Sequence, residues 1–329
     1  MGEALARNTH MKLLVVTQTI DLDDPVLGFF HRWVEELAKR LEHIEVICLL
    51  LGRHALPANV RVHSLGKETN HQQGGMIYHT IRQLRYAARF GWFMWSERSR
   101  YDSVFVHMNP EYIVLAGWLW RLLDKSVGLW YTHGTVSLRL RIAVFFSNVV
   151  FTASEGSMRV VTAKKRVMGH GIDLAQFPLA PPPVGEPKLI TIGRASRVKR
   201  LGLLQTAAAT AGQKLTVIES IPHAEIPAIL ASTHLFLHAS ATGSLDKAPL
   251  EALATGVPVI TTNRELAKAP GATFAEPTAE AFAEAIRGVV EKRVWVDTAR
   301  REAAREWVER NHDLTHLIPA ILTSYENLA

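Results

Sequence analysis

The sequence predicts an α/β protein made of two doubly wound parallel-sheet domains. The chain has 329 residues, which is more than one hydrophobic core usually serves. Short apolar segments alternate with amphipathic helical segments, and this alternation is typical of strand–helix–strand units in a parallel sheet. A proline-rich stretch interrupts the alternation at residues 181–187, after which the pattern starts again.

The first half begins with a continuous apolar run within Lys12–Thr17, as expected for a buried parallel strand. An amphipathic helix is predicted over Phe29–Leu41, because its apolar residues recur at helical spacing. A strand at Ile44–Leu51 closes the first strand–helix–strand unit. The same criteria predict strands at Val60–Ser64, Ser103–His107, Val127–Thr132 and Val149–Thr152, and helices at Gly75–Trp95, Glu111–Leu123 and Leu138–Phe146.

Three consecutive prolines make residues 181–187 a predicted interdomain linker, since prolines disfavour both helix and central strand. We therefore expect a Rossmann-like domain at residues 1–180 and another at residues 188–310. Strands of the second are predicted at Lys188–Ile192, Leu215–Glu219, Leu235–Ala239 and Pro258–Thr261. Its helices are predicted at Leu201–Ala211, Ala224–Ala231, Pro249–Ala254, Thr278–Arg293 and Asp297–Asn311.

The net charge of +6 lies entirely in the first half of the chain. Up to Ala180 there are 21 Lys and Arg against 15 Asp and Glu, whereas the remainder has 16 of each. An excess of positive charge in one half of the chain suggests an anionic partner, either a phosphate-bearing substrate or a membrane surface. A single cysteine, Cys48, excludes an internal disulfide, and no run approaches the roughly 20 apolar residues of a spanning helix. A cytoplasmic protein is expected.

Two segments of the second half are candidates for a binding site. The segment Thr242–Thr261 contains Ser244 and Asp246, either of which can cap the helix that opens near Pro249, and a helix start attracts anions. In Ile190–Leu201, a buried strand ends before a cluster of cations suited to a diphosphate: Arg194, Arg197, Lys199 and Arg200. Taken singly, a plain capped helix and a solvated basic turn remain open alternatives.

Together these segments resemble the retaining GT-B glycosyltransferases of group 1, also called family four, of the bacterial type. The matching residues are Gly193-Arg194 followed by Lys199, and the run LEALATGVPV at Leu250–Val259. His170–Asp173 with Phe177 also match, and Trp307–Tyr325 resembles a closing helix that crosses back to the first domain. The resemblance covers most of the chain and implies a GT-B fold with a central cleft, with residues 311–329 crossing back.

The resemblance also implies a role for each matching residue. Arg194 and Lys199, which follow Gly193, would neutralise the donor diphosphate as it leaves. Glu251 would accept hydrogen bonds from the ribose hydroxyls. Backbone amides of Ser244, Leu245, Asp246 and Lys247 would hold the sugar or its phosphates. In the first domain, Gly28 would let the backbone approach the donor phosphate, and His133 would face the transferred sugar; a helix-start glycine and a structural histidine are the alternatives.

The chain departs from the family pattern at one position. The family's glutamate pair has seven residues between its members, and the place of the first is taken by Gly243. The first glutamate normally contacts the donor sugar, so another group must supply that contact. Asp246, with Lys247 beside it, is the candidate.

No metal or cofactor is expected. No Asp-x-Asp motif stands where a metal site would be expected, and we interpret the acidic cluster of Asp21, Asp23 and Asp24 in the first loop as solvated. The resemblance implies metal-independent transfer with retention, in which the departing phosphate oxygen helps to deprotonate the acceptor. The donor would be a UDP- or GDP-sugar.

The acceptor side is expected in the first domain, where residues 82–100 mix arginines with aromatic residues. Such a helix suits an anionic bilayer, although a core-facing helix with an arginine-rich outer face is an equal alternative. A saccharide or lipid-linked acceptor in cell-surface polysaccharide or glycolipid synthesis would fit, with peripheral attachment to the inner face of the cytoplasmic membrane. No nucleic-acid-binding signature accompanies the patch.

Two other functions stay open. A GT-B sugar-nucleotide epimerase would use the same diphosphate site but needs carboxylates against the sugar ring, and Gly243 argues mildly against it. A degenerate binding or scaffold protein is suggested by the same glycine, but would have no need of Arg194, Lys199 and Glu251 together. A dehydrogenase is disfavoured, because no Gly-x-Gly-x-x-Gly follows either first strand.

Overall fold

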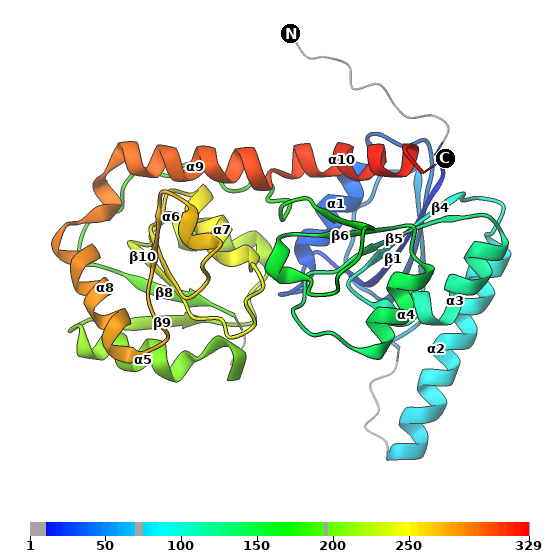
Figure 1. Ribbon diagram of the computed structural model, residues 1–329, viewed down its shortest axis with the longest axis horizontal. Coiled ribbons are helices and arrows are strands. Elements are labelled where there is room, and N and C mark those ends of the chain that lie inside the picture. The colour runs from blue at the N-terminus through cyan, green and yellow to red at the C-terminus, as the bar shows by residue number, and fades with distance from the viewer. Residues whose placement is uncertain (1–10, 70–74, 194–196, 329) are drawn as a thin grey trace, which may run out of the picture.

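The predicted fold is confirmed: two parallel sheets lie side by side, each flanked by helices (Figure 1). The computed structural model describes residues 11–69, 75–193 and 197–328. The seven-stranded first sheet has the order β3-β2-β1-β4-β5-β6-β7, and the five-stranded second sheet has the order β12-β11-β10-β8-β9. The strand order reverses beside β1 and β8, and ligands of doubly wound sheets bind outside the carboxyl ends of strands at such switch points.

The strands of the first sheet are short and mostly buried. They are β1 (Leu13–Ile20), β2 (Ile44–Leu51), β3 (Val60–Ser64), β4 (Ser103–His107), β5 (Ser126–Trp130), β6 (Val149–Thr152) and β7 (Lys165–Val167). The second sheet contains β8 (Leu189–Ile192), β9 (Leu215–Ile218), β10 (Leu235–His238), β11 (Val259–Thr261) and β12 (Ala272–Phe274). Sequence reasoning missed β7 and β12, because each has three residues and none of them is buried, whereas the equally short β11 is buried throughout.

The helices of the first domain are α1 (Gly28–Ala38), α2 (Met76–Ser96), α3 (Pro110–Leu122) and α4 (Leu138–Phe146). Those that follow are α5 (Leu201–Thr210), α6 (Ile226–Ala231), α7 (Lys247–Ala254), α8 (Ala279–Glu291), α9 (Thr298–His312) and α10 (Leu314–Glu326). None of the helices in the described ranges is long and apolar enough to cross a bilayer.

Alternate side chains of β1 and β2 enter two different cores of the first domain. One core packs against α1 and α10, and the other packs against α2, α3 and α4. Cys48 lies in the first core, and burial raises its pKa to about 12. It therefore behaves as a small hydrophobic residue, as expected.

Helices α9 and α10 run consecutively along both domains (Figure 1). Helix α9 packs against α7 of the second domain, whereas α10 packs against α1 of the first. The hydroxyl of Tyr325 in α10 donates to the Val104 carbonyl at 2.6 Å, inside the first sheet. The end of the chain thus packs against the first domain.

Candidate functional site

A pocket of about 260 Å³, here called the cleft pocket, lies between the two domains at the switch points of their sheets. The first domain contributes the approach to α1, and the second contributes the ends of β8 and β9 and the start of α7. Its lining includes Pro25, Val26, Phe29, Ile192, Gly193, Lys199, Ser220, His223, Asp246, Lys247 and Glu251. Five predicted site residues are therefore brought together from three separate parts of the second domain.

Asp246 is the centre of a polar group in this pocket. One of its oxygens, Oδ2, accepts from the Lys199 ammonium at 2.6 Å and from His238 Nε2 at 2.9 Å. Burial alone would raise the pKa of Asp246, but His238 and Lys199 lower it well below its usual range. Asp246 is the N-cap residue of α7, yet its side chain makes no capping hydrogen bond, because its carboxylate faces Lys199 instead.

Glu251 lies one helical turn further along α7 and is 4% exposed. Its Oε1 is 2.9 Å from Nε2 of His223, whose ring packs between those of Phe29 and Phe177. Burial raises the pKa of Glu251, but the hydrogen bond and charge of His223 and the charge of Lys247 outweigh burial and bring the pKa below its ordinary value, so the carboxylate is ionised. It is therefore an acceptor that a ribose hydroxyl could use.

The Lys247 side chain turns away from Lys199 and towards the first domain. Its ammonium donates to the carbonyl of Gly171 at 2.7 Å and lies 4.1 Å from the centre of the Phe29 ring. Burial lowers the pKa of this ammonium to about 8. Lys247 thus joins the two domains, a role that the sequence did not reveal.

The two predicted glycines stand where a side chain would disturb the pocket. A Cβ on Gly28 would lie 3.1 Å from the Leu22 carbonyl and 3.4 Å from Cβ of His223. Gly193 has a φ of +140°, and a Cβ there would lie 3.3 Å from Cε of Lys199. Both glycines therefore permit close packing around pocket residues.

Other predicted residues lie at the edge of the pocket or outside it. The Ser244 amide is bonded to Thr242 Oγ1 at 3.2 Å, and the Leu245 amide to Ser157 Oγ at 3.0 Å. His133 is exposed at the end of β5, and its neighbour Gly134 approaches the Thr242 carbonyl. Arg194 falls outside the described residues.

Two histidines of the site were missed by sequence reasoning. His238 ends β10, and His223 follows β9 at the start of a short 3-10 helix. Each is bonded to a carboxylate of the pocket. The signal that could have found them is their place near the carboxyl end of a predicted strand, since His238 is the last but one residue of the predicted Leu235–Ala239 and His223 follows Leu215–Glu219 by four residues.

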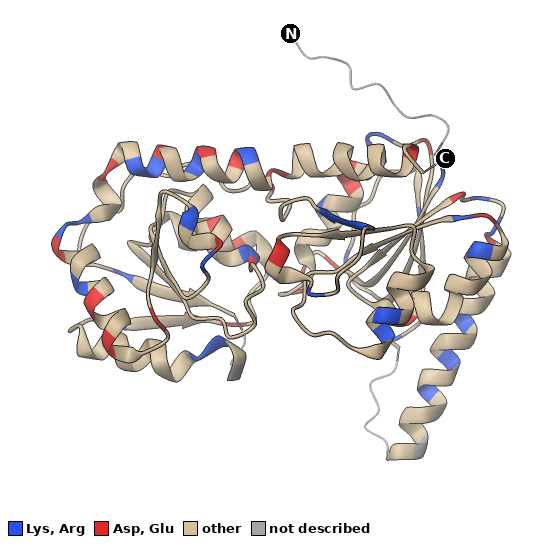
Figure 2. Ribbon diagram, viewed as in Figure 1, with Lys and Arg blue, Asp and Glu red and all other residues tan. Residues whose placement is uncertain are grey.

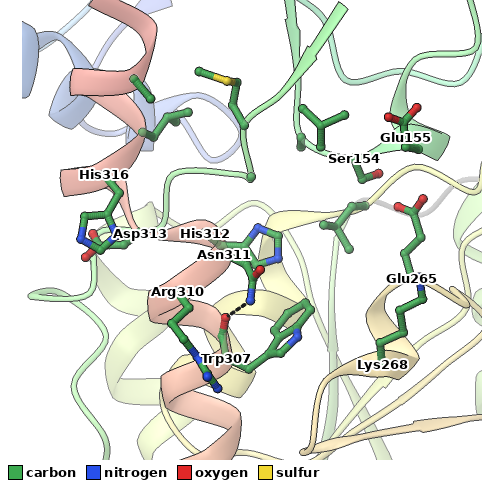
Figure 3. A pocket seen from close by; sticks show the side chains of 17 residues that line it. Ser154, Glu155, Glu265, Lys268, Trp307, Arg310, Asn311, His312, Asp313 and His316 are labelled. Atoms are coloured by element: carbon green, nitrogen blue, oxygen red, sulfur yellow. Dashed lines mark hydrogen bonds between the residues drawn. The ribbon is translucent and has the colours of Figure 1, made fainter. Parts of the chain in front are cut away.

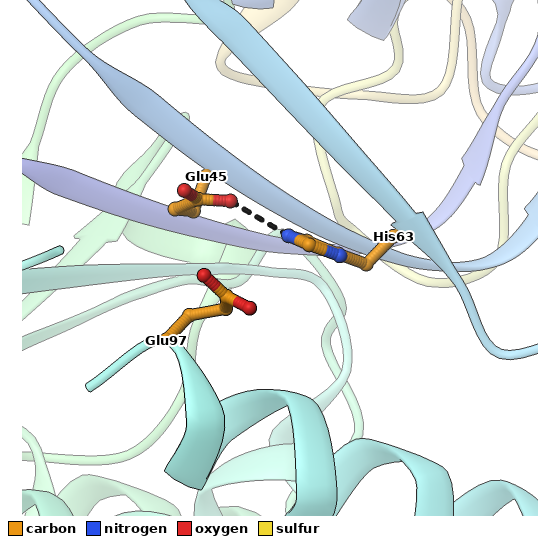
Figure 4. A group of neighbouring side chains, drawn as sticks. All are labelled: Glu45, His63 and Glu97. Atoms are coloured by element: carbon orange, nitrogen blue, oxygen red, sulfur yellow. Dashed lines mark hydrogen bonds and ion pairs between the residues drawn. The ribbon is translucent and has the colours of Figure 1, made fainter. Parts of the chain in front are cut away.

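One group of possible metal ligands lies in the described part of the chain, away from the cleft pocket (Figure 4). It consists of Glu45, His63 and Glu97, with ligand atoms within 4.8 Å of one another. Glu45 accepts from His63 at 2.7 Å, and Glu97 pairs with Arg100 at 3.1 Å. Arg100 also lies 3.6 Å from Glu45, so we interpret the group as a network of hydrogen bonds and ion pairs.

Comparison with known proteins supports the same assignment. Residues 168–292 match the family model described as glycosyl transferases group 1, and no curated protein sequence matches the chain. Sucrose-phosphate synthase from Thermosynechococcus elongatus is similar in structure, with a TM-score of 0.71, 15% identity, and 96% of this chain and 99% of that chain covered.

Two further solved structures cover the full length of the fold. HepE from Anabaena, in complex with UDP and glucose, has a TM-score of 0.70 at 15% identity, covering 97% of this chain and 100% of that chain. The lipopolysaccharide outer core galactosyltransferase WaaB has a TM-score of 0.66 at 12% identity, covering 96% and 100%. The chain therefore has the GT-B fold of the glycosyltransferase structures that it resembles, and its residues 168–292 match the family model of glycosyl transferases group 1.

Proposed function

We propose that this protein is a retaining glycosyltransferase whose nucleotide-sugar donor binds in the cleft pocket. The observation that carries the proposal is the presence of Lys199, Asp246 and Glu251 on one pocket wall, inside the region that matches the family. An ammonium suits a diphosphate, and an ionised buried carboxylate suits ribose hydroxyls. HepE, solved with UDP and glucose, makes a UDP-sugar the first donor to test, followed by GDP-sugars.

The residues of the pocket suggest how the donor is engaged. Lys199 pairs with Asp246 in the structure, and an incoming diphosphate competes for the same ammonium. His238 can keep Asp246 charged and oriented while Lys199 turns to the phosphates. Lys199 then stabilises the negative charge that develops on the leaving diphosphate. The charge of Lys199 would offset that of the leaving diphosphate without a metal ion. Asp246 remains near enough to the pocket to contact the sugar in place of the missing glutamate.

In the proposed transfer, the bond between the anomeric carbon and the diphosphate breaks while the acceptor oxygen attacks the same face of the sugar. The acceptor proton passes to the departing phosphate oxygen, so the products are the glycosylated acceptor and a protonated nucleoside diphosphate. Retention follows from attack on the face that the diphosphate leaves. His133, exposed at the end of β5, is the candidate contact to the sugar from the first domain.

The surface of α2, α3 and α4 supports a lipid-linked or saccharide acceptor delivered at a membrane. Large apolar side chains are exposed on all three helices: Leu84, Trp92 and Trp95 on α2, Leu115, Trp118 and Leu122 on α3, and Leu138 and Phe145 on α4. Helix α2 carries Arg82, Arg85 and Arg89 and no acidic residue (Figure 2). Cationic and aromatic side chains on one surface favour anionic lipid, which fits peripheral attachment on the cytoplasmic side and a role in polysaccharide or glycolipid synthesis.

Isothermal calorimetry against UDP, GDP and their sugar conjugates tests the donor site. We expect one nucleotide family to bind the wild type and the control Lys214→Ala, an exposed lysine outside the pocket. Lys199→Ala and Glu251→Ala should each weaken binding at least tenfold and abolish sugar transfer. Unchanged nucleotide binding and turnover in both variants would refute the site.

The same material separates the two alternatives. A protein that binds without turnover is the alternative that Gly243 suggests, since this glycine takes the place of the glutamate that contacts the donor sugar. Incubation with the bound sugar nucleotide and no acceptor, followed by proton NMR of the sugar, detects an epimerase through a new ring epimer. Binding without epimerisation, and without transfer to any membrane extract, would instead support the scaffold function.

A further inference from the structure

A second cavity lies beneath the junction of α9 and α10, separate from the cleft pocket (Figure 3). We call it the hinge cavity; its volume is about 530 Å³, roughly twice that of the cleft pocket. Its walls come from both domains: Ser154 and Met168 from the edge of the first sheet, Leu245 and Lys268 from the second domain, and residues 307–320 from the two helices. A ligand in this cavity would contact both domains and the two helices that join them.

The acidic side chains of the hinge cavity differ in their partners. Glu155 pairs with Lys165, and Asp313 accepts from the amide and from the hydroxyl of Thr315, each at 2.8 Å. Glu265 accepts from the Gly156 amide through Oε1 at 3.2 Å, whereas its buried Oε2 has no hydrogen-bond partner among the described residues. In the described part of the chain, none of these carboxylates forms an ion pair with Lys268 or Arg310.

Two basic side chains of the wall, Lys268 and Arg310, are exposed. Neither forms an ion pair with a carboxylate in the described ranges, and the only hydrogen bond of the Arg310 side chain there runs from Nε to the carbonyl of Glu306. Figure 3 shows the two cations on either side of the Trp307 ring. The terminal nitrogens of both are free to bind an anion, and the indole between them offers a flat apolar surface.

We propose that the hinge cavity binds a small phosphate-bearing ligand and thereby changes donor affinity in the cleft pocket. Arg310 offers a planar fork and Lys268 a point charge, which is the donor set that phosphate groups prefer. The cavity has room for a phosphorylated sugar, whose ring carbons could stack on Trp307. Of the described residues that the sequence assigned to the donor site, this wall contains Leu245, whose amide is bonded to Ser157.

The two cavities share one loop, which gives the coupling a physical route. Leu245 lies in the wall of the hinge cavity, while Asp246 and Lys247, the next two residues, lie in the wall of the cleft pocket. The Leu245 backbone is bonded to the first domain through both groups, its amide to Ser157 and its carbonyl to His170. A ligand that shifts Leu245 must therefore shift Asp246 or strain these bonds, and such coupling acts equally in both directions.

The test uses inorganic phosphate and a hexose 6-phosphate as probes, titrated calorimetrically into the whole protein. The informative variant is Lys268→Ala combined with Arg310→Ala. The matched control is Lys214→Ala combined with Lys292→Ala, which removes two exposed charges from the same domain outside the cavity. We expect saturable binding to the wild type and the control, and at least tenfold weaker binding to the cavity variant, with nucleotide binding retained in all three proteins.

The comparison between probes distinguishes the sources of the phosphate. Equal affinities indicate a site for the phosphate group alone, whereas tighter binding of the hexose 6-phosphate indicates contact between its ring and Trp307. The proposal is overturned if neither probe binds saturably, if the cavity variant binds as the wild type does, or if UDP displaces the probe competitively. Nucleotide affinity that is unchanged at saturating probe would overturn the coupling.

Discussion

Asp246→Asn tests whether the carboxylate at the centre of the cleft pocket interacts with Lys199 in solution. The substitution keeps the shape of the side chain and removes the charge that the Lys199 ammonium and His238 face at 2.6 and 2.9 Å. A hydrogen bond to a charged group contributes about 1.5–3 kcal/mol when buried, and an exposed ion pair about 0.2–1 kcal/mol. The Lys199 and Asp246 side chains are 28% and 26% exposed, so we expect a coupling of about 1–2 kcal/mol between these limits.

A double-mutant cycle of Asp246→Asn and Lys199→Met measures this coupling from the free energies of unfolding of four proteins in urea at pH 7. Because the folded-state pKa of Asp246 lies below its ordinary value of 3.8, its stabilisation is present above that pH and is lost as the pH falls through the folded pKa. A coupling below about 0.5 kcal/mol, the ordinary deviation from additivity of unconnected sites, would refute the pairing. Saturating donor nucleotide should reduce the coupling, since the diphosphate then competes for Lys199.

Three further predictions concern stability. Tyr325→Phe removes the buried hydrogen bond to Val104 and should lower the free energy of unfolding by about 1–2 kcal/mol in urea titrations; no change would contradict the bond. Gly128→Ala places a Cβ against the Tyr325 hydroxyl and should lower the melting temperature, an effect that Tyr325→Phe should partly relieve. The pKa of Lys247 is about 8 when folded and 10.5 ordinarily, so wild-type stability relative to Lys247→Met should rise between these pH values, where the unfolded chain binds the extra proton. A flat difference between pH 8 and 10.5 would rule out a buried ammonium.

The fold was largely predictable because its strands are buried on both faces. A parallel strand such as β2 presents a continuous apolar run, and the predicted Ile44–Leu51 has the observed bounds. The strands that were missed, β7 and β12, lie at the edges of their sheets. Each has three residues, none of them buried, so their sequences carry neither the length nor the apolar run on which the prediction rests.

The candidate site was predictable only in part. The positions of Gly193, Lys199 and Glu251 follow from a local order of strand, loop and helix, and the structure brings these residues to one pocket. The direction of a long side chain depends instead on distant segments. Lys247 points towards Phe29, more than 200 positions earlier in the sequence. Asp246 faces Lys199, which lies in the segment after a different strand, β8. The hinge cavity likewise exists only after α9 and α10 cross the domains, so no local pattern could predict it.

The position of α10 in the first core also bears on how the protein is made. The strands of the first sheet end at Val167, yet their core includes Leu317, Ile321 and Tyr325. A ribosome adding about 5–20 residues per second needs on the order of ten seconds to reach α10 after β7. During that interval the nascent first domain exposes an apolar face, and by its end all strands of the second domain have been synthesised. The domain that is synthesised first is therefore completed last, and we expect chaperones to bind its exposed apolar face.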